Sequence, residues 1–395
     1  MYRLRWAQKQ GRRHPFLVVI VSCIVAAIFL VEDVKWQMRS ATVSVWNRYH
    51  EKFKPAPDVN ITESDRVILF WTPFFGNLEF NIGYGRRPFS PCPASNCITT
   101  NQRRYLQRAD VVVFHPVEFS DFDLPAFRRP DQLWVFYMLE SPPNTGGQFK
   151  EATKGLFNLT MTYRRDSDIH QPYFKTVPLS EAERQRSSGV TMAPTLSATW
   201  ASLTQVRQRL PWVVSHCKTP GKREQFVEEL RRYIAVDIYG RCGPLRCSAP
   251  GGVLSPPDPR TCYRYVADNY RFYLSLENSR CRDYITEKFF LALNSSLIPI
   301  VYGASRADYE AVAPPHSFLH VDDYANPREL AGHVKYLLTH EAALAEYTAW
   351  RSEYKIEGAH RDGWCKLCEM LNKREVQRKE YADIKEWWSG PDVCH

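Results

Sequence analysis

Short runs of apolar residues recur along the chain from residue 67 onwards, and helix-like patterns separate many of them. Short apolar runs bounded by polar turns indicate buried β-strands, whereas apolar positions three and four apart indicate amphipathic helices. The runs lie at 67–75, 111–117, 134–140, 159–163, 212–217, 236–240, 272–276, 297–301 and 317–321, and the helical patterns at 221–234, 284–294, 305–312 and 327–339. Strands that alternate with helices form parallel sheets, so the pattern predicts the α/β fold class.

The chain is long enough for two domains, and a polar stretch divides the apolar runs into two sets. Its 395 residues exceed what one hydrophobic core usually holds. Residues 166–210 are polar and contain several prolines, so we place the linker there. We therefore predict an N-terminal α/β domain at 66–205, a C-terminal α/β domain at 206–362, and a tail at 363–395 that carries a Cys-x-x-Cys motif.

An uncharged apolar segment, residues 16–31, lies near the N-terminus. As a helix it spans about 24 Å, which is enough for a thin bilayer. Basic residues without acidic ones precede it, which favours a cytosolic N-terminus. A cleaved signal peptide is the alternative, but no small-residue cleavage site follows the run. We expect a cytosolic tail at 1–14, a transmembrane signal anchor at 15–31 and a stem at 32–65.

The net charge of +9 does not indicate a nucleic-acid-binding protein. Five of the positive charges lie in the first 14 residues, which leaves +4 for the rest of the chain. No later stretch combines dense basic residues with regularly spaced aromatic ones, the pattern typical of nucleic-acid binding. We therefore expect no nucleic-acid partner.

Sequons and cysteines favour a luminal location for the residues that follow the anchor. Asn60 and Asn158 begin Asn-x-Ser/Thr sequons that we expect to be glycosylated, whereas Asn294 lies in a predicted core helix. Ten of the eleven cysteines follow the anchor, and cysteines in an oxidising compartment form disulfides. The spacing of Cys365 and Cys368 also permits zinc binding or redox chemistry, although the compartment argues against zinc.

Residues 272–303 carry the strongest functional signal. A predicted strand ends in Glu277-Asn278, a polar loop follows, and Tyr284-Ile285-Thr286-Glu287-Lys288 begins a helix that precedes the next strand. Open α/β sheets bind ligands beyond the carboxyl ends of their strands, where helix N-termini point. A lysine there can offset phosphate charge, and a glutamate can accept hydrogen bonds from ribose hydroxyls. By spacing alone, the pair fits a solvated first turn at least as well.

This run, FYLSLENSRCRDYITEKFFLALNSSLIPIVYG, resembles the signature of the α1,3-fucosyltransferases, which use GDP-fucose. The likeness covers about residues 66–370 and is closest to invertebrate members. It implies a GT-B-like fold, in which two Rossmann-like domains face a central crevice, in a single-pass type II protein of the Golgi membrane with a luminal catalytic part.

The resemblance also implies an activity: inverting transfer of L-fucose from GDP-fucose in α1,3 linkage to N-acetylglucosamine. The acceptors would be glycans on glycoproteins or glycolipids, either lactosamine-type chains or N-glycan cores. A catalytically inactive glycan- or nucleotide-binding protein of the same fold is the alternative, because a fold alone does not establish activity.

The resemblance assigns roles to individual residues. The segment FYMLESPPNT is similar to the acceptor-side motif of the family, so Glu140 is expected to be the catalytic base. Lys288 and Arg223 are expected to meet the charge that develops on the diphosphate. The donor is further expected to contact Glu277, Asn278, Tyr284 and Glu287. By position alone, Glu140 also fits an acid that faces water, and Arg223 a surface residue of a helix.

Three more residues near these motifs have open roles. Arg164 and Arg165 are either additional anion contacts or partners of neighbouring acids. His216 stands where members of the family often have asparagine, which leaves its role undecided.

The resemblance also implies disulfides. Members of the Lewis type connect an N-terminal cysteine pair to a C-terminal Cys-x-x-Cys, so Cys92 and Cys97 are expected to bond to Cys365 and Cys368. Weaker predictions pair Cys242 with Cys247 and Cys217 with Cys262, and leave Cys281 and Cys394 unassigned.

Two Asp-x-Asp sequences could hold a metal ion. They are Asp121-Phe-Asp123 and Asp166-Ser-Asp168, and many glycosyltransferases use this pattern to bind manganese. The second sequence lies in a motif of the family that is not assigned to metal. Because Lys288 and Arg223 can neutralise the diphosphate, we expect no obligatory metal or other cofactor, although added Mn²⁺ can stimulate by pairing with GDP.

Overall fold

The computed structural model describes residues 56–145, 153–189, 207–247, 259–373 and 379–395. Apart from 76–78, these residues form one compact unit. None of the helices in these ranges has the length and hydrophobicity needed to cross a membrane. The predicted cytosolic tail, the anchor at 15–31 and most of the predicted stem lie outside the described residues.

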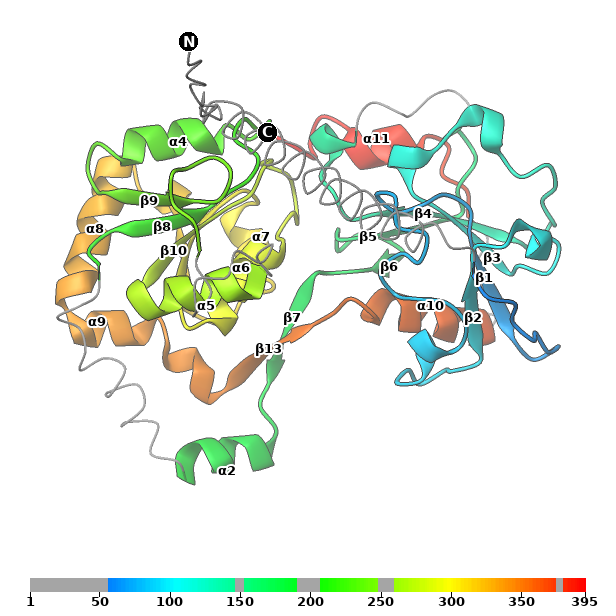
Figure 1. The fold of residues 1–395 in the computed structure, drawn as a ribbon, viewed down its shortest axis with the longest axis horizontal. Coiled ribbons are helices and arrows are strands. Elements are labelled where there is room, and N and C mark those ends of the chain that lie inside the picture. Colours follow the sequence, from blue (N-terminus) through cyan, green and yellow to red (C-terminus); the bar gives the residue numbers. More distant parts are fainter. Residues whose placement is uncertain (1–55, 146–152, 190–206, 248–258, 374–378) are drawn as a thin grey trace, which may run out of the picture. The chain divides into compact units, whose positions relative to one another are not determined.

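The first sheet contains six parallel strands in the order β2-β1-β3-β4-β5-β6 (Figure 1). They are β1 (Arg66–Phe70), β2 (Cys97–Thr100), β3 (Val111–Phe114), β4 (Leu133–Met138), β5 (Leu159–Thr162) and β6 (Ile169–His170). Neighbouring residues of β1 enter different cores, since Ile68 packs with residues of α10 (Asp362–Lys373) and Val67 with residues of α11 (Ile384–Ser389). Because both faces are covered, the central strands β3 and β4 are apolar at every position.

The C-terminal half contains a second set of parallel strands. β8 (Leu210–Val213) pairs with β9 (Val236–Tyr239), and β10 (Phe272–Leu276), β11 (Ile298–Tyr302) and β12 (Leu319–His320) follow in that order. Its helices are α4 (Arg223–Leu230), α5 (Pro259–Asn269), α6 (Glu287–Asn294), α7 (Arg306–Glu310), α8 (Pro327–Thr339) and α9 (Glu341–Glu346). β8 also lies against β10. Parallel strands with helices between them confirm the predicted α/β class.

An antiparallel strand pair carries the chain between the two sets of strands (Figure 1). β7 (Phe174–Pro178) pairs with β13 (Tyr354–Gly358). β7 and the following helix α2 (Glu181–Gly189) lie within the segment predicted as a linker. Residues 363–395, predicted only as a tail, form most of α10 and all of α11, so the end of the chain completes the cores of the first sheet. Short 3₁₀ helices are η1 (Arg87–Phe89), η2 (Arg103–Tyr105), η3 (Pro116–Glu118), η4 (Asp121–Asp123), η5 (Pro142–Asn144), η8 (Val321–Asp323) and η9 (Ala349–Ser352).

Disulfides connect distant parts of the described chain. Bonds Cys92–Cys365 and Cys97–Cys368 confirm the expected link between the N-terminal pair and the Cys-x-x-Cys, and they hold α10 to the first sheet. The other bonds are Cys217–Cys242, Cys247–Cys262 and Cys281–Cys394. The predicted pairs Cys242–Cys247 and Cys217–Cys262 are therefore wrong. β8 and β9 are adjacent and parallel, so the loops after them bring Cys217 and Cys242 together.

Candidate active site

Glu140 lies two positions beyond β4, and hydrogen-bond donors from both halves of the chain orient its carboxylate. Glu140 Oε1 accepts hydrogen bonds from Tyr284 Oη at 2.6 Å, Ser141 N at 2.8 Å and Asn278 Nδ2 at 3.3 Å. The Ser141 hydroxyl also donates to Ser279 Oγ at 2.8 Å. The structure thus brings together three predicted site residues, Glu140, Asn278 and Tyr284.

Tyr284 holds the predicted base from the loop between β10 and α6. Its side chain is buried, and its ring lies 5.0 Å from that of Tyr163. Burial is the main cause that raises the pKa of Tyr284, and the neighbouring Tyr173 and Glu140 raise it further. The phenol therefore stays protonated and donates to Glu140.

A second cluster surrounds Lys288 at the start of α6. Lys288 Nζ lies 3.0 Å from Glu277 Oε2, 3.3 Å from Glu287 Oε1 and 2.7 Å from Thr286 Oγ1. Burial would lower the pKa of Lys288, but the charges of Glu277 and Glu287 outweigh it and raise that pKa. Lys288 is therefore a permanent cation at the carboxyl end of β10.

The two glutamates beside Lys288 have different environments. Glu277 is fully buried, and burial raises the pKa of its carboxyl although Lys288 opposes this effect. Glu287 keeps 44% of its side chain exposed. Burial would raise the pKa of Glu287, but the charge of Lys288 outweighs it and lowers that pKa. Glu287 can therefore reach a ligand, whereas Glu277 acts on Thr286 and Lys288 from inside the core.

Arg223 begins α4 and is buried rather than exposed on the helix surface. Its Nη1 donates to the carbonyl of Leu276 at 2.5 Å and its Nη2 to that of His216 at 3.3 Å. Burial lowers the pKa of this guanidinium. Its Nε is buried and has no hydrogen-bond partner among the described residues. Since Leu276 precedes Glu277, Arg223 and Lys288 flank the same strand end.

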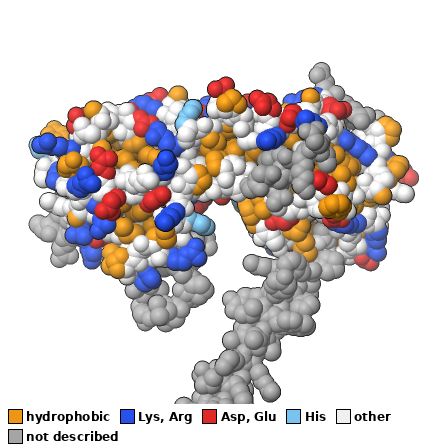
Figure 2. All heavy atoms as spheres, turned by 90° about the horizontal axis from the view of Figure 1, so that it is seen from above, with side chains coloured by type: hydrophobic (Ala, Val, Ile, Leu, Met, Phe, Trp, Pro, Cys, Tyr) orange, Lys and Arg blue, Asp and Glu red, His pale blue; other side chains and the backbone are white. Residues whose placement is uncertain are grey.

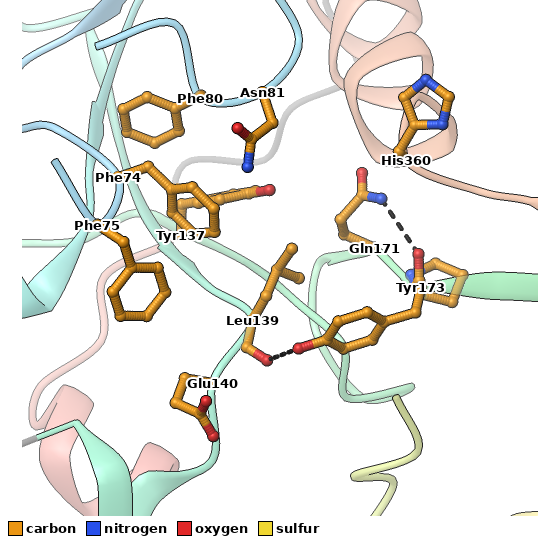
Figure 3. Close-up of a pocket in the computed structure, with 11 residues that line it drawn as sticks. Phe74, Phe75, Phe80, Asn81, Tyr137, Leu139, Glu140, Gln171, Tyr173 and His360 are labelled. Atoms are coloured by element: carbon orange, nitrogen blue, oxygen red, sulfur yellow. Dashed lines mark hydrogen bonds between the residues drawn. The ribbon is translucent and has the colours of Figure 1, made fainter. Parts of the chain in front are cut away.

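A pocket of about 250 Å³ lies beside Glu140 (Figure 3). Phe74, Phe75, Phe80 and Tyr137 lie on one side of it, and Gln171, Tyr173 and His360 lie on the other. Tyr173 donates a hydrogen bond to the carbonyl of Leu139, which fixes its ring against the residue before Glu140. The aromatic lining consists of Phe74, Phe75, Phe80, Tyr137 and Tyr173. The carboxylate therefore borders an apolar space large enough for part of an organic ligand.

The remaining basic candidates are held by acids. Arg164 pairs with Asp166 at 2.6 Å and is 2% exposed, so it is a structural residue of the first half. Arg165 pairs with Asp283 at 2.5 Å and Asp308 at 2.6 Å. The sequence left two roles open for Arg164 and Arg165, and the structure supports the one in which they pair with neighbouring acids. The His216 side chain is exposed, and its carbonyl accepts from Arg223.

The two Asp-x-Asp sequences are engaged with protein groups. Asp166 pairs with Arg164 and Arg282, and Asp168 pairs with Lys379. Asp123 pairs with Arg103. Within the described ranges, no three His, Cys, Asp or Glu side chains are grouped so as to hold a metal ion.

The predicted glycosylation sites differ in exposure. Asn60 is exposed, so glycosylation there stays a prediction. Asn158 is 1% exposed, its Nδ2 donates to the carbonyl of Lys379 at 2.9 Å, and its Oδ1 accepts from the backbone of Trp134 at 3.0 Å. A glycan on Nδ2 would disrupt these contacts, so a modified Asn158 does not agree with the folded structure. Asn294 is exposed at the last position of α6 rather than enclosed in a core helix.

Sequence reasoning missed several residues of the site. Thr286 donates through Oγ1 to both oxygens of Glu277, each at 2.9 Å. The helix predicted from residue 284 begins instead at Glu287, which places Thr286 at its N-cap, a position where Ser and Thr are common. Ser279 and Tyr173 carried no signal in the sequence, because their contacts with Ser141 and Leu139 join segments far apart in the sequence.

An α/β fold with an oriented carboxylate and buried cations at strand ends is typical of enzymes that transfer a group from a phosphate-bearing donor. Residues 63–174 match the model "Fucosyltransferase, N-terminal", and residues 203–387 match "Glycosyltransferase family 10 (fucosyltransferase) C-term". α-(1,3)-Fucosyltransferase C of Drosophila melanogaster is 32% identical, and the match covers 82% of this chain and 78% of that protein. The chain belongs to the fucosyltransferases of glycosyltransferase family 10.

Other relatives come from insects and mammals. Glycoprotein 3-α-L-fucosyltransferase A of Drosophila melanogaster is 35% identical over 80% of this chain and 59% of that protein. α-(1,3)-Fucosyltransferase 7 of Mus musculus is 34% identical over 84% of this chain and 77% of that protein. A crystal structure of an α1,3-fucosyltransferase with GDP-fucose aligns with a TM-score of 0.49 at 18% identity, over 85% of this chain and 97% of that chain. The family resemblance expected from the sequence, and with it the enzyme class of glycosyltransferase, is confirmed.

Proposed function

We propose that the enzyme transfers L-fucose from GDP-fucose in α1,3 linkage to N-acetylglucosamine of glycoprotein or glycolipid glycans, with inversion. The observation that carries the proposal is Glu140, whose carboxylate is oriented by Tyr284 and borders the aromatic pocket. The acceptor hydroxyl oxygen attacks the anomeric carbon while the bond from that carbon to the phosphate oxygen breaks. Glu140 takes the hydroxyl proton, and the bonding electrons leave with GDP.

In this proposal the cations at the end of β10 receive the diphosphate. Lys288 carries a fixed charge, and Arg223 has a buried Nε without a partner in the described part of the chain. Lys288 and the two acids that it contacts, Glu277 and Glu287, lie near the first turn of α6. The backbone N–H groups of this turn also favour an anion. The half-exposed Glu287 is suited to accept hydrogen bonds from ribose hydroxyls.

The aromatic pocket is suited to the acceptor. A sugar ring presents an apolar face of C–H groups to aromatic rings and hydroxyls at its rim, and the pocket offers Tyr137 and Tyr173 beside the carboxylate of Glu140. The acceptor would then enter from the side of the first sheet and the donor from the side of the second, as in a GT-B-like crevice.

The same proposal includes the surroundings of the enzyme. The apolar segment at 16–31 and the basic residues before it support a single-pass type II protein of the Golgi membrane with a luminal catalytic part. The disulfides agree with an oxidising compartment. The chemistry requires no metal ion from the protein, although Mn²⁺ can assist by pairing with GDP.

A transfer assay tests the proposal. The full-length enzyme is incubated with labelled GDP-fucose and with lactosamine, chitobiose or an N-glycan core, and the linkage of each product is determined. We expect α1,3-linked fucose on N-acetylglucosamine of at least one acceptor. GDP binding without transfer to any acceptor would favour the inactive alternative, which no feature of the site supports.

A further inference from the structure

The loop 279–285, between β10 and α6, carries Tyr284 and is fastened to the first half of the chain. Cys281 and Tyr284 belong to the hydrophobic cluster of the first sheet. The C-terminus holds the loop through the disulfide Cys281–Cys394 and through a hydrogen bond of 2.8 Å from Arg282 N to the carbonyl of Val393. A loop held in this way has little freedom, so the position of Tyr284 depends on its fastenings.

Arg165 makes the most direct of these fastenings. Its backbone N donates to Asp283 Oδ2 at 3.1 Å, and its Nε donates to Asp283 Oδ1 at 2.5 Å. Its Nη2 donates to Asp308 Oδ1 at 2.6 Å. Asp308 in turn caps α7 through Ser305. One guanidinium therefore joins the segment after β5 to the loop before α6 and to α7.

Asp283 depends on this contact for two reasons. It has a φ of +60°, a left-handed conformation that an L residue keeps only where its surroundings hold it. Its side chain is 6% exposed and that of Asp308 is 8% exposed, and both pair with Arg165. Burial and the neighbouring Asp308 raise the pKa of Asp283, so Arg165 is the cation between two interacting acids. His170, in the same small cavity, adds no charge at neutral pH, because burial lowers the pKa of its ring.

We propose that Arg165 is a positioning residue, which holds Asp283 and thereby sets the hydrogen bond from Tyr284 to Glu140. The proposal rests on the function of Glu140 as the base. Without Arg165, the two acids would repel each other and Asp283 would leave its strained conformation. Tyr284 follows Asp283 directly, so its hydroxyl would move away from Glu140.

A pH profile distinguishes positioning from a general structural role. In this proposal kcat/KM falls at acidic pH when the base is protonated, while burial raises the pKa values of the neighbouring Tyr163, Tyr173 and Tyr284 and keeps them protonated. Burial also raises the pKa values of Asp283 and Glu277, so a variant without the Asp283 carboxyl is profiled beside the others. Loss of a hydrogen bond to a carboxylate moves its titration to higher pH. All profiles are recorded with His360→Gln, which removes the histidine that lines the pocket.

Three variants of the full-length enzyme form the test. We expect Tyr284→Phe and Arg165→Gln each to move the acidic limb upwards by roughly half to one pH unit, and the double variant to move it no further. Arg282→Gln is the matched control, because Arg282 lies in the same loop but pairs with the half-exposed Asp166, and we expect an unmoved limb. If Arg165→Gln does not fold, Arg165→Lys replaces it, since lysine keeps a cation but cannot bridge both acids as the guanidinium does. Asp283→Asn keeps the shape and tolerates the backbone conformation, so we expect it to leave the limb unmoved and to show that the limb does not report the Asp283 carboxyl.

Two results would overturn the proposal. One is a drop in kcat/KM for Arg165→Gln that is equal at every pH, and the other is a limb shift that adds fully to that of Tyr284→Phe. Glu140→Gln separates this inference from the proposed function. Full activity in Glu140→Gln would refute the role of the base itself, whereas an inactive Glu140→Gln with an unmoved limb in Arg165→Gln would refute only the positioning role.

Discussion

The ammonium of Lys288 lies 3.0 Å from the carboxylate of Glu277, which is fully buried. An ion pair in this environment stabilises the protein only as a pair, because each charge alone would remain desolvated without a partner. The contact between Lys288 and Glu277 therefore fixes the charge of Lys288. The same contact joins the end of β10 to the start of α6, the two segments that carry most of the predicted donor-binding residues.

Replacement of Lys288 by methionine should lower the free energy of unfolding by about 3 kcal/mol, because Glu277 is left buried without a cation. The double variant Lys288→Met/Glu277→Gln should recover most of this loss. Urea denaturation followed by tryptophan fluorescence measures both values. The exposed Lys335→Met serves as the control and should unfold like the wild type. Equal losses in the single and double variants would show that the pair is not the cause.

Phe75 should contribute to acceptor binding and not to donor binding. It lines the pocket beside Glu140 and is 51% exposed, so Phe75→Ala removes contact area without opening the core. We expect the KM for the acceptor to rise by about tenfold while the KM for GDP-fucose stays unchanged. Phe122 is 98% exposed and does not line the pocket, so Phe122→Ala is the matched control. A raised KM for the donor instead would place the nucleotide, and not the acceptor, in this pocket.

The stability lost on removing either disulfide to α10, Cys92–Cys365 or Cys97–Cys368, should depend on whether the other one is still present. They join nearly the same two segments, with sequence separations of 273 and 271 residues. While Cys92–Cys365 is intact, Cys97–Cys368 closes only a short loop, so its removal by alanine substitutions should cost about 2–3 kcal/mol. Removal of both disulfides should cost more than twice as much as removal of Cys97–Cys368 alone, because the last disulfide to be removed closes a very long loop. Urea denaturation of the two variants decides between this result and equal, additive losses.

Asp237 should make stability depend on pH in the acidic range. Burial would raise the pKa of Asp237, but hydrogen bonds from Arg209 and Tyr270 outweigh it and lower that pKa below its ordinary value of 3.8. Since the folded state binds the proton less tightly, the contribution is present above the unfolded pKa and is lost as the pH falls through the folded pKa. Asp237→Asn should therefore be less stable than the wild type at pH 7, and the difference should shrink below about pH 4. Denaturation between pH 7 and pH 3 tests this, with the exposed Glu346→Gln as control.

Chelation of divalent ions should leave transfer activity measurable. Lys288 and Arg223 provide the positive charge at the end of β10, and no described cluster of acids or histidines is arranged to hold an ion. We expect EDTA to lower the rate by less than about tenfold, below the roughly 100- to 1,000-fold that one essential charge-stabilising group contributes, and Mn²⁺ to restore it. Complete and reversible loss of activity in EDTA would show that an ion is essential.

Most of the parallel strands could be predicted because helices cover both of their faces. β2 and β6 were missed, because β2 ends in two threonines and β6 has two residues, so neither forms an apolar run. Residues 111–114 and 272–276 are buried at every position and apolar apart from Ser275, so the expected runs start with β3 and coincide with β10. β7 and β13 could not be found in this way. They form a ribbon without a fully buried face, as the partly exposed Phe174 and Tyr354 show, and their sequences carry no continuous apolar run.

The candidate site was predictable where its residues share one motif, and less so where the fold joins motifs. Glu277, Glu287 and Lys288 lie within twelve positions of one another, and the strand-loop-helix pattern placed them at one strand end. The hydrogen bond between Tyr284 and Glu140 joins residues 144 positions apart. The burial of Arg223 and the contacts of Arg165 with Asp283 and Asp308 likewise depend on tertiary packing, which no spacing in the sequence records.

The most direct test of the central claim is the transfer rate of Glu140→Gln in the full-length enzyme at saturating GDP-fucose. Glutamine keeps the shape of the side chain and its acceptor oxygen but cannot take the acceptor proton at neutral pH. The account predicts that kcat falls by at least about 100-fold while GDP still binds, and that the exposed Glu341→Gln remains fully active. A Glu140→Gln variant as active as the wild type would contradict the account, because the proton would then have to leave by another group.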